Sequence, residues 1–268
     1  MLAALDWPGF ADLSLAGLLF LCSAAFVAGA VDAIVGGGGL IQLPAMLLLA
    51  PGGEVIYSLA TSKVAAVAGT TAAARTYAKT TPIDWRSALP MAFVALLGSL
   101  GGAVFADLLP SGVLNIVVLA ALLLVGIYTW RKPELGADHR PRFGRHGQIA
   151  LMIAGGAVIG FWDGIAGPGT GSFLVFLLVG MIGYAFVTAS ATAKIVNVAT
   201  NVGALAFFIP AGKILWGLAL AMAASNMAGS VLGALLASQR GSAFVRRVFL
   251  TVVVGLVVSL GWKLALGG

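Results

Sequence analysis

The stretch Asp32-Ala-Ile-Val-Gly-Gly-Gly-Gly-Leu40 has a counterpart, Asp163-Gly-Ile-Ala-Gly-Pro-Gly-Thr-Gly171, and together the two decide how this chain is organised. Each places an aspartate four residues before a glycine cluster in an otherwise apolar region. A shift of 131 residues superposes one on the other without a gap, and it also pairs Lys63 with Lys194. Charged residues are scarce in this chain, so these matches indicate an internal duplication. We therefore expect two similar halves.

Composition predicts the fold class. Sixty per cent of the residues are hydrophobic and 9% are charged, whereas soluble domains are roughly a quarter charged. The mean hydropathy is +1.07, and apolar stretches near the ~20 residues that cross a bilayer recur along the chain. These values exclude a soluble helical protein and predict an all-α polytopic membrane protein. The single cysteine, Cys22, excludes a disulfide within the chain.

Each half divides into five apolar stretches, of which the second is short and follows the glycine cluster. The predicted boundaries are residues 1–131 for the first repeat, 132–148 for a basic linker and 149–268 for the second repeat. The stretches run over residues 12–34, 39–50, 55–77, 85–107 and 112–131, and then over 149–165, 171–186, 190–210, 215–238 and 248–264.

Loop charges predict the orientation of the halves. The linker is rich in arginine, which favours the cytoplasm of a bacterial inner membrane. If all ten stretches cross, Arg75, Lys79 and Arg86 also lie inside, and five crossings per half make the repeats inverted. A competing count treats the short stretches as re-entrant and gives eight crossings with parallel halves. That count exposes the cluster around Arg246, so we favour inverted repeats.

The glycine clusters predict irregular backbone at membrane depth, which survives only where protein buries it or where it lines a wet cavity. A helix begins after each cluster, and its free N–H groups favour an anion. Close helix packing is the alternative role, and we adopt it for the glycines at 98, 102, 229 and 233. The candidate anion ligands from the two clusters are Gly36, Gly37, Gly38, Gly39, Gln42, Gly167, Gly169, Thr170, Gly171 and Ser172.

Lys63 and Lys194 are the sharper signal, because a charge at the helix centre costs about 2.5–3.5 kcal/mol on insertion scales. Each could neutralise an anionic substrate or form a structural ion pair across the repeats, Lys63 with Asp163 and Lys194 with Asp32. Asp163 is also the candidate for proton coupling.

The helix around Lys194 carries two further polar candidates. Lys194, Asn197 and Asn201 share one helix face. The first half has Ala66 and Thr70 in place of the two asparagines. This difference predicts a binding site that leans toward the second repeat.

Other chemistry finds little support. The clusters lack the lysine and the preceding strand of a phosphate-binding loop, and no Ser/His pair or HExxH pattern lies at membrane depth. We therefore expect no enzyme activity, no cofactor, no metal site and no nucleic-acid partner. Trp162 adjoins Asp163 and is either a gate or a packing residue.

At these residues the sequence resembles the TauE/SafE sulfite exporter family of anion transporters. The motifs are Ala28-Gly-Ala-Val-Asp-Ala-Ile-Val-Gly-Gly-Gly-Gly-Leu40 with Pro44, and Gly160-Phe-Trp-Asp-Gly-Ile-Ala-Gly-Pro-Gly-Thr-Gly-Ser172. The resemblance covers about residues 12–264. It implies transport of sulfite, organosulfonates or related sulfur anions, and seven or eight crossings rather than ten.

These features predict a secondary transporter in which two repeats rock around the paired loops. The expected partners are a small anion, a coupling ion (proton or sodium) and the lipid bilayer, and a homodimer is compatible with them. Two alternatives stay open: a cation carrier that uses both aspartates, and a membrane scaffold that transports nothing.

Overall fold

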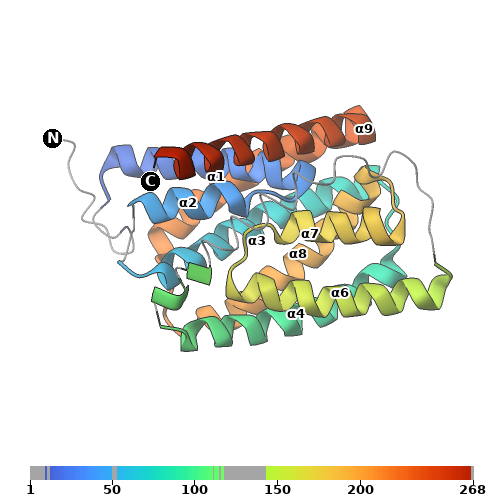
Figure 1. Cartoon of the computed structure of the whole chain (residues 1–268), viewed down its shortest axis with the longest axis horizontal. Coiled ribbons are helices and arrows are strands. Elements are labelled where there is room, and N and C mark those ends of the chain that lie inside the picture. Colours follow the sequence, from blue (N-terminus) through green and yellow to red (C-terminus); the bar gives the residue numbers. More distant parts are fainter. Residues whose placement is uncertain are drawn as a thin grey trace.

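The computed structural model describes residue 10 and residues 13–49, 53–110, 112–114, 116–117 and 143–266, and its main elements there are helices (Figure 1). Most of the predicted stretch 112–131 and most of the linker lie outside these residues, so the boundaries between the repeats stay predictions. The elements are α1 (Leu15–Val35), α2 (Gly39–Leu49), α3 (Val55–Thr80), α4 (Trp85–Leu108), α6 (Arg145–Ile165), α7 (Thr170–Phe176) with the π-helical turn η1 (Leu177–Ile182), α8 (Phe186–Phe208) and α9 (Trp216–Leu266).

The long helices confirm an all-α polytopic membrane protein. Within the described residues, five helical stretches are long and apolar enough to cross a bilayer: Leu15–Val35, Trp85–Leu108, Arg145–Ile165, Phe186–Phe208 and Trp216–Gly241. Helix α3 has 26 residues, which is long enough to cross, but it carries Lys63, Arg75 and Lys79 and is not among these five stretches. Helix α9 bends at Gly241, where φ is 71°, so it contains the last two predicted stretches.

The two short helical segments, Gly39–Leu49 and Thr170–Ile182, are too short to cross a membrane. Helix α2 has 11 residues, about 16 Å at the helical rise, against ~30 Å of hydrocarbon. It folds back along α1: a Cβ at Gly38 would lie 2.6 Å from the carbonyl oxygen of Ala28, and one at Gly17 would lie 3.4 Å from Leu49. The short helix therefore returns to the end of the molecule at which α1 begins. The expectation that all ten stretches cross is not met by α2.

The second half repeats this hairpin with α6 and the α7–η1 segment. That segment spans 13 residues, again too few to cross. A Cβ at Gly155 in α6 would lie 2.4 Å from the Leu177 side chain at the start of η1, so the short segment packs back against its partner helix.

The two hairpins enter from opposite ends of the molecule (Figure 1). Helix α3 starts where α2 ends and carries the chain to the other end, where α4 begins. There Gln148, in the first turn of α6, donates a hydrogen bond to Ser87 in the first turn of α4 at 3.4 Å. Helix α6 therefore starts at the end opposite to the start of α1.

Glycines let helices of different halves approach closely. A Cβ at Gly98 or Gly102 of α4 would lie 2.6 Å or 2.1 Å from the carbonyl oxygen of Ala157 or Phe161 in α6. The packing role predicted for these glycines is confirmed. The contact recurs between α9 and α1 at the positions related by the 131-residue shift. A Cβ added at Gly229 would lie 2.0 Å from the Phe26 carbonyl oxygen, and one added at Gly233 would lie 2.3 Å from the Ala30 carbonyl oxygen.

This packing predicts opposite outcomes for two adjacent alanine substitutions. Gly102→Ala should lower the free energy of unfolding by about 1–3 kcal/mol, because its methyl group meets backbone. Gly101→Ala should be neutral or stabilising by up to about 1 kcal/mol, because the nearest atom to its Cβ is the Phe161 ring at 3.9 Å. Thermal unfolding of the detergent-solubilised variants measures both, and equal melting temperatures would contradict the packing.

Candidate functional site

The tips of the two hairpins cross in backbone contact. Gly36 ends α1 in the left-handed region, with φ of 79°. A Cβ there would lie 2.1 Å from the carbonyl carbon of Gly171, and the Ser172 amide donates to the Gly36 carbonyl at 3.0 Å. Gly167 and Gly169 turn the second loop, also at positive φ. Only glycine satisfies both the conformation and the approach at Gly36.

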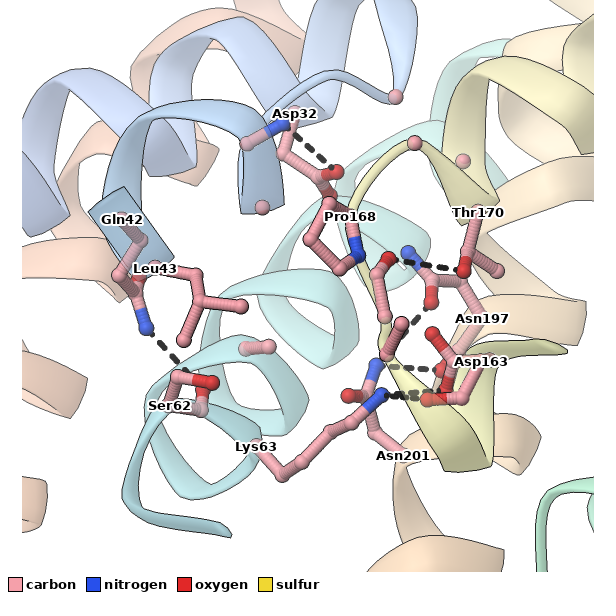
Figure 2. A pocket seen from close by; sticks show the side chains of 18 of the residues that line it. Asp32, Gln42, Leu43, Ser62, Lys63, Asp163, Pro168, Thr170, Asn197 and Asn201 are labelled. Carbon is pink, nitrogen blue, oxygen red and sulfur yellow. Dashed lines mark hydrogen bonds and ion pairs between the residues drawn. The ribbon is translucent and has the colours of Figure 1, made fainter. Parts of the chain in front are cut away.

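Beside this crossing lies a cavity of about 50 Å³ (Figure 2). It has room for a few water molecules or for a compact anion. Its lining comes from both glycine loops, α2, α3 and α8, with one asparagine from α9.

Most of the residues predicted for the site line this cavity, and three do not. Gly37, Ser172 and Lys194 lie outside the lining. The predicted residues that line it are Asp32, Gly36, Gly38, Gly39, Gln42, Lys63, Asp163, Gly167, Gly169, Thr170, Gly171, Asn197 and Asn201.

Both buried lysines pair across the halves. Lys63 Nζ lies 2.7 Å from Asp163 Oδ2, and Lys194 Nζ lies 2.6 Å from Asp32 Oδ2. Each ammonium also donates to the main-chain carbonyl of the same aspartate at 2.6 Å. These carbonyls belong to the last turns of α6 and α1, where a cation is favoured by the helix dipole. The two pairs together carry no net charge.

The two pairs differ in their access to the cavity. Lys63 lines it, and its Nζ would lie 3.0 Å from a Cβ at Gly167. Lys194 is fully buried and does not reach it. Within the described part of the chain, the counter-charge that the cavity offers to an anion therefore comes from Lys63.

Several hydrogen-bond donors around the cavity have no acceptor. In the described part of the chain, the amides of Gly39, Gly169 and Gly171 bond to no protein atom. The side-chain oxygen of Asn197, Oδ1, accepts from Thr200 Oγ1 and Asn201 Nδ2, while no described residue accepts from its Nδ2. Asn197 is 94% buried (6% exposed). Since none of the fully buried side-chain nitrogens and oxygens of the described residues lacks a partner, Asn197 Nδ2 keeps access to the cavity, where a ligand that accepts hydrogen bonds can bond to it.

The C-terminal end of α1 is sealed by donors from other helices. Tyr77 Oη donates to the Ala33 carbonyl at 2.9 Å, and Ser190 Oγ donates to the Ile34 carbonyl at 2.9 Å. Ser172 donates from Oγ to the Val35 carbonyl at 3.3 Å. The Ser172 amide donates to the Gly36 carbonyl, and Lys194 Nζ donates to the Asp32 carbonyl. Each of the five main-chain carbonyls from Asp32 to Gly36 therefore has a hydrogen-bond donor.

The corresponding end of α6 lacks these donors. At the positions related to Tyr77, Ser190 and Ser172 the chain has Phe208, Leu59 and Ile41, whose side chains cannot donate. The end of α6 therefore lacks the hydroxyl donors that hold the end of α1, and the second loop is held by bonds from its own half, such as that from Thr170 Oγ1 to the Gly167 carbonyl at 2.9 Å.

Asn226 is a cavity residue that sequence reasoning missed. Its Nδ2 donates to Gln42 Oε1 at 2.8 Å, and Gln42 Nε2 donates to the Ser62 carbonyl at 3.1 Å. This chain joins α9, α2 and α3 beside the cavity. A buried asparagine in an apolar stretch was the available signal, as it was for Asn197.

Trp162 braces the second loop. Its Nε1 donates to the Pro168 carbonyl at 3.3 Å, and its ring packs edge-on against Phe173. The packing alternative for this residue therefore has a specific contact, which fixes the loop carbonyl just before Gly169.

The sealed end of α1 predicts a stability effect for Tyr77. Tyr77→Phe leaves the buried Ala33 carbonyl without its donor and should cost about 1–3 kcal/mol. Tyr57→Phe, on the same helix but partly exposed, is the control and should change stability by under about 0.5 kcal/mol. Chemical denaturation in detergent compares them, and equal effects would show that the hydroxyl does not hold the helix end.

Comparison with known proteins agrees with this architecture. A family model described as sulfite exporter TauE/SafE matches residues 21–260. The "Probable membrane transporter protein ORF9" of a Sinorhizobium species is 33% identical over 250 residues, covering 93% of this chain and 94% of the relative. "Probable membrane transporter protein YfcA" of Escherichia coli K12 is 34% identical over 248 residues, covering 91% and 88%.

A "Probable membrane transporter protein" of Haemophilus influenzae is 30% identical over 235 residues, covering 88% of this chain and 91% of the relative. No solved structure matches the chain. The family model spans both hairpins and both lysines, so the predicted resemblance is confirmed. The chain belongs to the sulfite exporter TauE/SafE family.

Proposed function

We propose that this protein is a secondary transporter of small anions in the bacterial inner membrane, with sulfite, organosulfonates or related sulfur anions as substrates. The family description and the relatives' names support membrane transport and a sulfur oxyanion. The observation that carries the proposal is the cavity at the loop crossing, with its unpaired amides and Lys63.

The donors suit an oxyanion. Gly39, Gly169 and Gly171, whose amides bond to no described protein atom, line the cavity from two different loops. Asn197 and Lys63 line it from α8 and α3. Oxyanions accept several hydrogen bonds at once, and bonds to a charged acceptor are the stronger ones. The volume of about 50 Å³ favours a compact ion such as sulfite in this conformation.

Transport would proceed by alternating access between inverted repeats. Support comes from the hairpins that enter from opposite ends and from the reciprocal packing of α4 on α6 and α9 on α1. Thr80 and Ser238 share a hydrogen bond of 3.0 Å at the end that also carries Arg75, Lys79 and Arg240. We assign this basic end to the cytoplasm by the positive-inside rule.

The two alternatives are weaker on this geometry. A cation carrier needs free carboxylates, and both aspartates are paired with lysines at 2.7 Å or less. A scaffold is compatible with the closed ion pairs. It does not account for the cavity beside unpaired amides, because the interior of a purely structural protein is normally close-packed.

Uptake of radiolabelled sulfite into proteoliposomes tests the proposal. Purified protein should give saturable uptake above empty vesicles, competed by methanesulfonate and not by divalent metal ions. Thermal shifts of the detergent-solubilised protein with the same compounds give an independent readout. Stabilisation by metal ions alone would favour the cation carrier, and a flat response to all of them would favour the scaffold.

A further inference from the structure

We propose that the anion and one proton bind together at the Lys63–Asp163 pair, the anion on Lys63 and the proton on Asp163, while the Lys194–Asp32 pair stays closed. This inference rests on the proposed function and names its coupling ion and the residue that carries it. It assigns different tasks to two pairs that the sequence repeat makes look equivalent.

The charges at the crossing require a compensating ion. Lys63 and Lys194 are already balanced by Asp163 and Asp32, so an added anion leaves the buried centre with a net negative charge. Such a charge at membrane depth is unfavourable. A proton that enters with a monoanion restores neutrality.

Asp163 is the aspartate that has to give up its partner. The cavity exposes Lys63 and not Lys194, so an anion competes with Asp163 and leaves Asp32 paired. Lys194 also shares the sealing of α1 with Tyr77 and Ser190, which holds it in place. No such seal surrounds Lys63, because the related positions are Phe208 and Leu59.

The surroundings of Asp163 are simple. Lys63 of α3 is the charged side chain in contact with it within the described residues. From α4, Ser99 Oγ donates to Asp163 Oδ2 at 3.5 Å, and α8 presents the neutral Asn197 and Asn201 across the cavity. The Asp32 carboxylate of α1, balanced by Lys194, lines the same cavity. Protonation of Asp163 therefore depends on Lys63, on Asp32 and on the anion that occupies the cavity.

The exchange balances as follows. A hydronium ion from solution gives its proton to the Asp163 carboxylate and leaves as neutral water, and the hydrogen bond from Lys63 Nζ to Asp163 Oδ2 breaks. The same ammonium then donates to the incoming anion, so one positive and one negative charge enter together. Lys63 keeps its bond to the Asp163 main-chain carbonyl, which holds the ammonium in the cavity while its side-chain partner changes.

Calorimetry in several buffers counts the protons. Methanesulfonate stays a monoanion, so its binding to the detergent-solubilised protein in buffers of different ionisation enthalpy reports protons taken up by the protein. We expect about one proton per anion, and hence an affinity that falls about tenfold per pH unit on the alkaline side. Asp163→Asn should bind with no proton uptake and with a flat pH profile.

Asp32→Asn is the comparison, since it removes the related carboxylate, which also lines the cavity. It should lower the melting temperature and weaken binding, and the anion that still binds should take up about one proton. Wild-type binding without proton uptake, or uptake lost in Asp32→Asn and kept in Asp163→Asn, would overturn the assignment. Affinity that depends on sodium instead of pH would also overturn it. Absence of any methanesulfonate or sulfite binding would instead refute the proposed function.

Discussion

Lys194→Met should destabilise the protein by about 3–5 kcal/mol, because it leaves the Asp32 carboxylate, 13% exposed, without its partner. Lys194 is fully buried and also caps the Asp32 carbonyl in the last turn of α1. Adding Asp32→Asn should restore much of the loss, since the unpaired charge is then gone.

The surface lysine Lys213 is the control. It lies 3.6 Å from Asp107, and both side chains are about a quarter to a third exposed. Lys213→Met should cost about 1 kcal/mol or less. Denaturant unfolding in detergent measures all the variants. If Lys194→Met proved as mild as Lys213→Met, the Lys194–Asp32 pair would not hold the hairpin.

Removal of Lys63 should have the largest effect on binding. The variant Lys63→Met/Asp163→Asn keeps the centre neutral, so it should fold, yet it lacks the lysine that, among the residues the structure describes, lines the cavity. Loss of a desolvated charge pair typically costs 2–5 kcal/mol, so sulfite affinity should fall on the order of a hundredfold or more. Equilibrium binding of radiolabelled sulfite measures this effect.

The equivalent exchange in the other pair provides the matched comparison. Lys194→Met/Asp32→Asn removes the same two charges from a place that the anion does not contact through lysine. It should lose less than about tenfold in affinity, because the remaining contacts are to uncharged groups. Equal losses in the two double variants would mean that the pairs act alike, against the asymmetry seen here.

The asymmetry has a structural consequence for the transport cycle. Ser172 and Ser190 of the second half seal the end of α1, so the first hairpin is fixed to the other repeat. At the positions related to Ser172 and Ser190, the first half has Ile41 and Leu59, whose side chains cannot donate such bonds to the end of α6. We therefore expect the loop around Gly167 and Gly169 to be the one that rearranges when the anion enters.

Much of the fold and of the site could be predicted from residue types and the 131-residue shift. Aspartate and lysine are scarce in an apolar chain, so their positions alone indicated the duplication and the two pairs. The glycine clusters indicated broken helices for the same reason, since four consecutive glycines weaken a helix.

Other features depend on packing and could not be predicted. The return of α2 along α1 follows from the contacts of Gly38 and Gly17, which only the folded chain reveals. Lys63 and Lys194 look alike in sequence, and the cavity distinguishes them. Tyr77 and Ser190 act through main-chain carbonyls, which leave no mark in the sequence of the helix that they seal.

Anomalous diffraction from crystals grown with selenite, the selenium analogue of sulfite, tests the central claim most directly. The account predicts one dominant selenium peak at the loop crossing, within hydrogen-bond distance of Lys63 Nζ and of the Gly169 or Gly171 amide, and its loss in Lys63→Met/Asp163→Asn. A peak confined to the basic end near Arg75 and Arg240, with none at the crossing, would contradict it.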